Sequence, residues 1–167
     1  MGAPTIGAVH VVAVLPAWMV ADGEYRDVAV GATAEFGFAL EPEIVEPRSA
    51  PPSFEQTGED VPVTTASGMV TSPSTQTPPV LDTGVVKPLL RGTASEGDTV
   101  IARGRLVLEP LLWATDGVLW PLVPDGVRLW SVERVRRVGS DVTDLEAVPA
   151  PVDVDHEAVY LLDLTRP

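Results

Sequence analysis

The sequence of 167 residues contains no cysteine, which excludes both a disulfide framework and thiolate catalysis. It also contains no asparagine and only one lysine, Lys87, so arginine supplies nearly all of the positive charge. This usage indicates a GC-rich coding bias, typical of high-GC bacteria and their phages. A chain without cysteine fits a reducing compartment, and we therefore expect a cytoplasmic location.

Basic residues are few relative to acidic ones. There are 11 Lys and Arg against 24 Asp and Glu, which gives a formal net charge of −13 and an isoelectric point of about 4.3. Because proteins bind phosphate backbones through Lys and Arg, this balance disfavours nucleic acid and anionic membranes as partners. The charge predicts either simple solubility or a basic protein partner, and it leaves the oligomeric state open.

Long apolar runs are also missing. No run approaches the roughly 20 apolar residues that a membrane-spanning helix needs. The apolar N-terminal stretch lacks the basic region of a signal peptide, and His10 and Pro16 interrupt it. We predict a first strand over residues 6–15, in which His10 is a hydrogen-bonded structural group, and a last strand over residues 158–164 that closes the sheet.

The residues that are present favour β structure. Hydrophobic residues make up 45% of the chain, valine and leucine contribute most of them, and few helix formers occur in periodic runs. Residues 25–40 alternate as a half-buried antiparallel strand does, and Gly37 on the opposite face indicates a bend or close packing. Residues 99–109 predict another strand, whose small inner residues Ala102 and Gly104 indicate strong curvature.

Two Asp-Gly pairs divide residues 97–129 into three strand-like runs and predict a three-stranded meander. At the second pair, Pro124 has no N–H to donate, so we expect a three-residue loop with Gly126 in the left-handed position of a bulge. At the first pair a two-residue loop is favoured, and a three-residue loop that starts at Thr115 stays open.

These two turns would place Trp113 opposite Trp120, and Trp120 opposite Trp130, in one row across three strands. Cross-strand pairs contribute about 0.2–1 kcal/mol each, so such a row can fix the register of a sheet. The row is either a buried ladder or an exposed aromatic binding surface. We therefore name Trp113, Trp120 and Trp130 as candidate binding residues.

Residues 41–83 differ in composition, being rich in Pro, Ser, Thr and Glu without an apolar period. Such a segment predicts a flexible insertion, either a passive loop or a docking arm, within a single β domain that spans residues 1–167. Lengthening a loop tenfold costs only about 2 kcal/mol in closure entropy, which a barrel core tolerates.

The run after Leu129 contains a basic cluster. Valines at a spacing of three suit one helical turn there, whereas the flanking residues favour a strand with a bulge. The arginines of this run and of residues 99–109 are candidates for contacts with a ligand or nucleic acid, although nearby carboxylates favour local ion pairs. These candidates are Arg103, Arg105, Arg134, Arg136 and Arg137.

No motif in the sequence enforces a catalytic mechanism, since it has no Gly-rich phosphate loop, no nucleophile elbow and no zinc-binding His-Glu-x-x-His helix. Residues 153–157 come nearest to a metal site, but they lack the twelve-residue ligand pattern of a calcium loop. We therefore expect no metal ion and no cofactor. An enzyme is the weakest function hypothesis, and a cavity holding His10 or His156 beside two carboxylates would support it.

Two stretches carry a resemblance to a known group of proteins. Residues 25–40, with a Val-Gly pair before an alternating strand, and residues 118–135, which contain LWPLVPDGVRLWSVERV, resemble parts of small actinobacterial β-proteins classed as domains of unknown function. The tryptophan- and cysteine-rich opening typical of such proteins is absent here. The shared motifs are turn chemistry, so no functional residue carries over.

We predict a mainly β protein, built as a small curved antiparallel sheet or partly open barrel of the SH3-like or OB-like sort, with about five to seven strands. The long insertion would lie between its second and third strands. Barrels of this kind bind through a face or a rim of loops. The favoured function is a non-catalytic, acidic protein-interaction module. The alternative is a small barrel that binds a ligand or nucleic acid through an arginine face.

Overall fold

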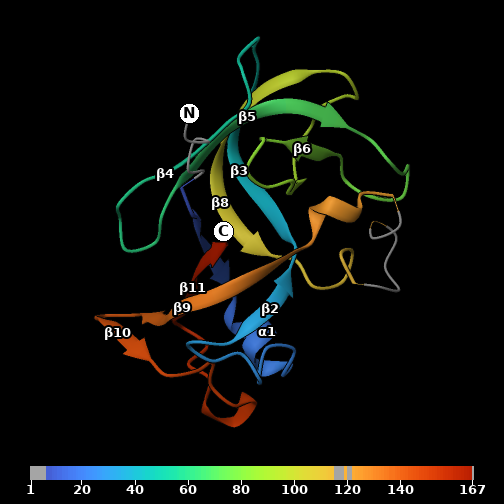
Figure 1. Cartoon of the computed structure of the whole chain (residues 1–167). Coiled ribbons are helices and arrows are strands. Elements are labelled where there is room, and N and C mark those ends of the chain that lie inside the picture. Colours follow the sequence, from blue (N-terminus) through green and yellow to red (C-terminus); the bar gives the residue numbers. More distant parts are fainter. Residues whose placement is uncertain (1–6, 115–118, 120–121, 167) are drawn as a thin grey trace, which may run out of the picture.

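The chain is mainly β, with 47% of its residues in strands and 7% in helices (Figure 1). The computed structural model describes residues 7–114, 119 and 122–166. The strands are β1 Val9–Leu15, β2 Thr33–Phe36, β3 Phe38–Pro47, β4 Ser53–Gln56, β5 Thr64–Thr71, β6 Val80–Asp82, β7 Leu89–Leu90, β8 Thr99–Leu108, β9 Arg128–Val138, β10 Val142–Leu145 and β11 Val159–Arg166. The helices are α1 Ala17–Ala21 and the short 3-10 helices η1 Pro124–Gly126 and η2 Pro151–Asp153. No helix among the described residues is long and apolar enough to cross a membrane.

Five strands close into a barrel, so the predicted mainly β fold with a small barrel is confirmed. β5 pairs with β8, β8 with β3, β3 with β7, β7 with β6, and β6 with β5, which returns the hydrogen-bonded ring to its start. Closure removes the free edges of these strands. The side chains that fill the interior are Leu40, Ala66, Val70, Leu81, Leu90, Val100 and Ala102.

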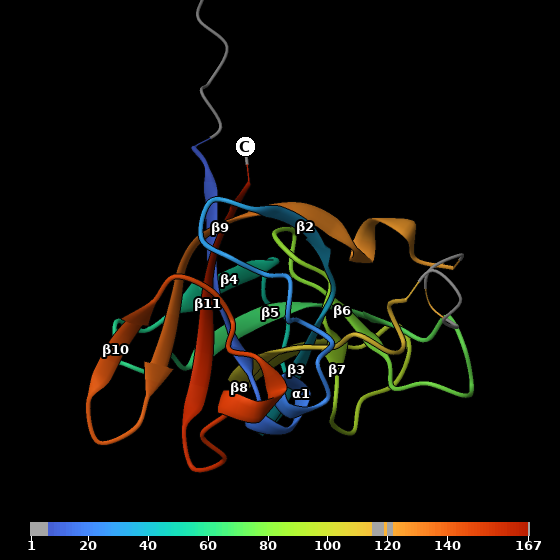
Figure 2. The same ribbon diagram turned by 90° about the horizontal axis from the view of Figure 1, so that it is seen from below.

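Beyond the barrel, β8 continues into a second part of the sheet, in the order β8, β1, β11, β9 and β10, and β2 pairs with the first half of β9. Figure 2 shows β9, β10 and β11 on one side of the molecule and β6 and β7 on the opposite side. The core under this part buries the aromatic side chains of Phe38, Trp130 and Tyr160, and α1 adds Met19 and Val20. This core is larger and more aromatic than the interior of the barrel.

The strand β8 belongs to both parts because it changes neighbours along its length. Residues Thr99–Gly104 pair with β5, and Val107 then pairs with β1 in parallel. At Gly104 a Cβ atom would lie 2.0 Å from the carbonyl oxygen of Glu41, so only glycine allows β3 to approach this closely. Gly104 is thus needed for close packing, and the curvature expected at Ala102 and Gly104 stays a prediction. The sheet is mixed, since β1–β8 and β3–β7 are parallel.

The side chain of Gln56 joins the barrel to β1. Its Oε1 accepts a hydrogen bond from the Val12 N–H at 2.7 Å, and its Nε2 donates to the Val12 carbonyl at 2.7 Å and to Thr64 Oγ1 at 3.1 Å. The amide of this one side chain thus makes the pair of bonds that a neighbouring strand would make.

The expectation that residues 41–83 are a flexible insertion is wrong. This segment contains most of β3 and all of β4, β5 and β6, and two of these strands have fully buried residues that fill the barrel. The reason lies in the size of the barrel, whose interior accepts small side chains such as Ala66 and buries the hydroxyl-bearing Thr64. At Gly68 a Cβ atom would lie 1.8 Å from the carbonyl oxygen of Asp82. A composition poor in large apolar residues therefore indicates tight packing here, and not disorder.

The predicted three-stranded meander is also wrong where the structure can be compared with it. β8 and β9 are not neighbours, because β8 pairs with β1, β3 and β5 while β9 pairs with β2, β10 and β11. Residues 109–114 form turns, and the three residues of the second predicted loop form the 3-10 helix η1. Trp120 lies outside the described residues, so its pairing with Trp113 or Trp130 stays a prediction.

Two glycines make room for one indole, the side chain of Trp113. A Cβ atom at Gly37 would lie 2.3 Å from Trp113 Cγ, and one at Gly126 would lie 2.2 Å from the far edge of the ring. Gly126 has no positive φ, so its predicted left-handed conformation is wrong, and close packing explains the glycine instead. Trp113 Nε1 donates to the Phe38 carbonyl at 2.8 Å. The predicted close packing at Gly37 is confirmed, with an indole as the neighbour.

Other local predictions agree with the structure. The first strand is β1, and the run after Leu129 is the strand β9, with a register shift opposite Asp163 and Leu164 that leaves Glu133 as the bulged residue. The last strand is β11, but it lies between β1 and β9 in the interior of the sheet, so the prediction that it closes the sheet is wrong.

The predicted structural role of His10 is also wrong. His10 is exposed on β1, and its side chain makes no hydrogen bond to a residue that the structure describes.

We expect Gly126→Ala to lower the free energy of unfolding by about 1–3 kcal/mol, because the new methyl group must displace the buried Trp113 ring. Urea denaturation followed by fluorescence measures the change. Gly139→Ala is the matched control, since nothing lies within 4 Å of a Cβ atom built there. Equal stabilities of the two variants would show that Trp113 is not held in this way.

Candidate functional site

A pocket of about 250 Å³ lies beside Trp113, and we call it the acidic pocket. Three carboxylates, three aromatic rings and small or apolar residues line it, and none of the described lining residues is basic. The lining residues are Glu24, Tyr25, Glu35, Phe36, Gly37, Glu109, Pro110, Trp113, Ala114 and Val127.

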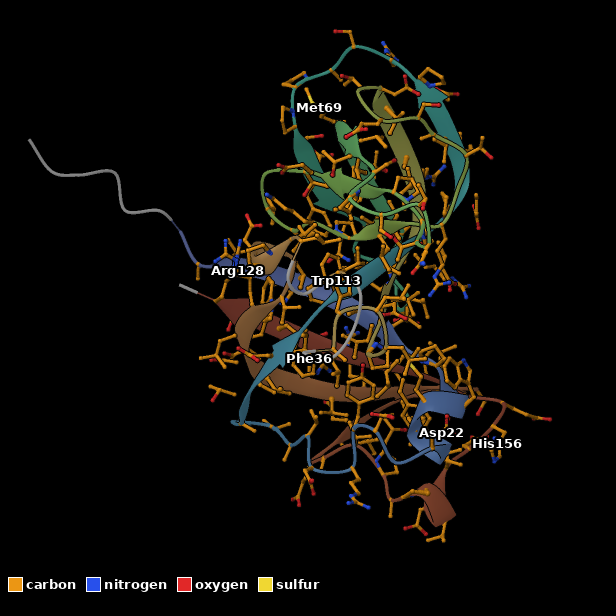
Figure 3. The ribbon with its side chains drawn as sticks, turned by 90° about the vertical axis from the view of Figure 1, so that its right-hand side faces the viewer. Asp22, Phe36, Met69, Trp113, Arg128 and His156 are labelled. Atoms are coloured by element: carbon orange, nitrogen blue, oxygen red, sulfur yellow. The ribbon has the colours of Figure 1, made fainter. Side chains whose placement is uncertain are left out.

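Four separate segments bring these side chains together. Glu24 and Tyr25 lie in the turns after α1. Glu35 and Phe36 are the last two residues of β2, and Gly37 follows them as the residue between β2 and β3. The segment after β8 supplies Glu109, Pro110, Trp113 and Ala114, and the chain between η1 and β9 supplies Val127. Figure 3 labels Phe36 and Trp113, which lie next to each other on this side of the molecule. The pocket therefore exists only in the folded chain.

Glu109 is held rigidly at the end of β8. Its side chain is buried, and its Oε2 accepts a hydrogen bond from the Leu112 N–H at 2.7 Å. The other oxygen, Oε1, lies 3.6 Å from a terminal nitrogen of Arg91, whose side chain is 43% exposed. A buried carboxylate with a single, distant and partly solvated cation keeps much of its charge available to a further positive group.

Tyr25 has a hydroxyl without a hydrogen-bond partner among the described residues, although the residue is only 8% exposed. Burial raises the pKa of this phenol well above its ordinary value, and the negative charges of Glu109 and Glu24 raise it further. The phenol therefore stays neutral at physiological pH. Its hydroxyl makes no hydrogen bond to a residue that the structure describes, so it can donate or accept one in the pocket.

This arrangement suits a cation. Carboxylates form charge-assisted hydrogen bonds with ammonium and guanidinium groups, and aromatic faces attract the same groups. Two exposed leucines border the pocket: Leu111 is 64% exposed beside Pro110, and Leu129 is 60% exposed opposite Glu35 in the β2–β9 register. A cationic group carried on an apolar surface would thus meet complementary charge in the pocket and apolar contact at its border.

The predicted tryptophans do not form an exposed aromatic surface in the described part of the chain. Trp113 is 3% exposed and lines the acidic pocket, whereas Trp130 is 1% exposed in the core. Trp130 packs edge-on against Phe38 at 5.6 Å between ring centroids, and the guanidinium of Arg166 lies 5.1 Å from its ring. Trp113 and Trp130 are therefore buried and do not belong to an exposed binding surface. Trp120 lies outside the described residues.

The predicted arginines fall into two groups. Arg103 and Arg105 are exposed on β8, and Arg105 is opposite Glu41 in the register with β3. Arg134 makes two hydrogen bonds to the Asp144 carboxylate, at 2.6 and 3.0 Å, which hold the pKa of Asp144 below its usual range. Arg136 is buried and pairs with Asp163 at 2.5 Å. Arg134 and Arg136 therefore form local ion pairs, which is the interpretation that the sequence favoured for this cluster.

Two further hollows hold the histidines. A pocket of about 370 Å³ contains His10, Glu59 and Asp163, and another of about 460 Å³ contains His156 beside the exposed Trp18 and Arg105. The first meets the residue set named above for an enzyme. However, Arg136 engages Asp163, and no hydrogen bond joins His10 to either carboxylate, so the contact that general acid–base catalysis uses is missing.

The cluster at residues 153–157 has a structural role. Asp155 Oδ1 accepts a hydrogen bond from the Glu157 N–H at 3.0 Å, and the Asp155 N–H donates to Tyr160 Oη at 2.9 Å. In the part of the chain that the structure describes, no group of three or more His, Cys, Asp or Glu is arranged to hold a metal ion.

Sequence reasoning missed four residues of the acidic pocket: Glu24, Tyr25, Glu35 and Glu109. They are far apart in the sequence, and each has a simple local interpretation as a turn or surface residue. The one local signal is Glu109, an acidic residue that ends an apolar strand directly before a proline.

No family model, no curated protein and no solved structure matches this chain. The resemblance to actinobacterial β-proteins of unknown function therefore stays a prediction. What the protein does has to be inferred from the chemistry of its own surface.

The two ion pairs made by arginines of β9 should contribute differently to stability, because one is buried and the other is exposed. We expect Asp163→Ala to lower the free energy of unfolding by about 3–5 kcal/mol, because it leaves the buried Arg136 without a counter-charge. Asp144→Ala is the matched control, as its pair with Arg134 is in solvent and should change stability far less. Chemical denaturation of both variants tests this, and similar losses would contradict the assigned burial of the Arg136 pair.

The raised pKa of Tyr25 predicts a loss of stability at alkaline pH. Above about pH 10 the unfolded chain releases the phenol proton while the folded chain retains it, so rising pH favours unfolding. The slope reaches at most about 1.4 kcal/mol per pH unit. We expect Tyr25→Phe to remove this contribution. Denaturation measured at several values from about pH 9 to about pH 11 gives the free energy of unfolding as a function of pH. This free energy should fall less steeply with pH in the variant, and equal slopes would show that Tyr25 titrates normally.

Proposed function

We propose that this protein is a non-catalytic interaction module for a basic protein partner, and that the acidic pocket receives one Lys or Arg side chain of that partner. The observation that carries the proposal is the pocket beside Trp113, which three carboxylates line together with Tyr25, whose hydroxyl has no hydrogen-bond partner among the described residues. No described lining residue is basic. The net charge of −13 supports it, because it attracts basic partners over distance.

The shape of the surroundings supports a protein as the source of the cation. A free metal ion would gain nothing from the rings of Phe36 and Trp113, whereas the stem of a Lys or Arg side chain packs against such rings. The exposed leucines Leu111 and Leu129 offer apolar contact around the point of entry. Protein interfaces combine these features, with apolar and aromatic contacts around a few desolvated charged groups.

The alternative, a ligand or nucleic acid bound through the arginine face, has less support. That function requires arginines that share a face free of carboxylates, but Arg134 and Arg136 are paired with Asp144 and Asp163. Arg105 lies opposite Glu41 in the sheet. Carboxylates at these positions would repel phosphates from the same face. Retention of single-stranded DNA or RNA on filters at low salt would revive this alternative.

We expect the double variant Glu24→Gln/Glu35→Gln to weaken binding of a Lys/Arg-rich peptide by at least about tenfold, because both carboxylates are exposed on the pocket lining. Isothermal titration with an oligo-arginine and an oligo-lysine peptide measures this. The control Glu46→Gln/Glu55→Gln removes the same charge from exposed positions that line none of the described pockets. Equal weakening by the two pairs would reduce the effect to general charge attraction and refute the pocket.

A further inference from the structure

A second small pocket, which we call the basic pocket, has the opposite charge. It has a volume of about 90 Å³ and includes three of the 11 basic residues, among them the one lysine. Lys87 comes from the loop between β6 and β7, Arg128 from the start of β9 and Arg166 from the end of β11. Its lining residues are Asp82, Gly84, Val85, Val86, Lys87, Asp125, Arg128 and Arg166.

Two carboxylates do not balance the three cations. Asp125 Oδ2 lies 2.8 Å from Lys87 Nζ and 3.8 Å from a terminal nitrogen of Arg128, so one oxygen serves two positive groups. Asp82 lies 3.5 Å from the same Lys87 nitrogen. Arg166 makes no ion pair among the described residues. In a chain with a net charge of −13, this pocket therefore carries a local excess of one positive charge.

Arg166 is fixed in place by uncharged groups. One of its terminal nitrogens donates to the Val85 carbonyl at 2.5 Å, and its guanidinium lies over the ring of Trp130. Arg128 lines the same pocket, and burial together with the positive charge of Arg128 lowers the pKa of Arg166. The remaining N–H groups of Arg166 are held in a fixed orientation before any ligand arrives.

We propose that the basic pocket binds a small oxyanion, namely a carboxylate group, bridged between Arg128 and Arg166 with Lys87 nearby. A carboxylate supplies the one negative charge that the pocket lacks, and its two oxygens match the planar fork of a guanidinium. The volume of about 90 Å³ admits one such group, and the remainder of a larger ligand would lie outside the pocket. This site is separate from the acidic pocket and does not depend on the function proposed for it.

The test uses the whole protein titrated with sodium acetate, and separately with sodium phosphate, at constant ionic strength set with sodium chloride. Two-dimensional NMR follows the indole N–H of Trp130, because Arg166 lies over that ring. We expect saturable shifts with acetate that are lost in Arg128→Gln, a substitution of a side chain that is 51% exposed. Arg103→Gln, exposed on β8 outside the described pockets, should retain them.

A second variant tests the charge balance directly. Asp125→Asn removes a carboxylate that competes for the same cations, so we expect it to tighten acetate binding by at least about threefold. Saturation by phosphate alone would overturn the assignment to a carboxylate. Shifts that rise linearly with acetate and chloride alike, in the wild type and in Asp125→Asn, would overturn the site itself.

Discussion

The packing of Trp113 between two glycines is the contact on which most of the rest depends. The indole occupies the space that side chains at Gly37 and Gly126 would fill, and its N–H is bonded to the Phe38 carbonyl. It thereby links three segments: the break between β2 and β3, the turns after β8, and the helix η1. The same ring forms one wall of the acidic pocket, so the shape of the pocket is set by a core contact.

Local strand patterns were predictable from the sequence, whereas their partners were not. An apolar run predicted β1, a face of small and apolar residues predicted β8, and the residues flanking a valine repeat favoured a strand at β9. Pairing is decided by contacts between distant segments, so the Asp-Gly signals favoured a local meander, whereas the described strands β8 and β9 pair with other parts of the chain. Residues 41–83 were misjudged because a segment with few large apolar residues is usually expected to be disordered. In this barrel the close-packed residues are small or polar, such as Ala66, Gly68 and Thr64.

The candidate site was hidden for a related reason. Of the residues that line the acidic pocket, only Trp113 was named as a binding candidate from the sequence, and it was named for a row of tryptophans and not for a pocket. Glu24, Glu35 and Glu109 come from three segments that meet only after the sheet has formed, so no spacing in the sequence connects them. The distribution of charge was hidden in the same way. In a chain of net charge −13, Val127 lines the acidic pocket, while the nearby Asp125 and Arg128 line the basic one.

The amide of Gln56 has a consequence for how the protein behaves at high concentration. β1 pairs with β11 along its whole length, but on its other side it meets β8 only at Val14. The free backbone groups of Val12 on that side would be a template on which a strand from another molecule could add. Because Gln56 already bonds both groups, a strand from another molecule cannot pair with β1 at Val12.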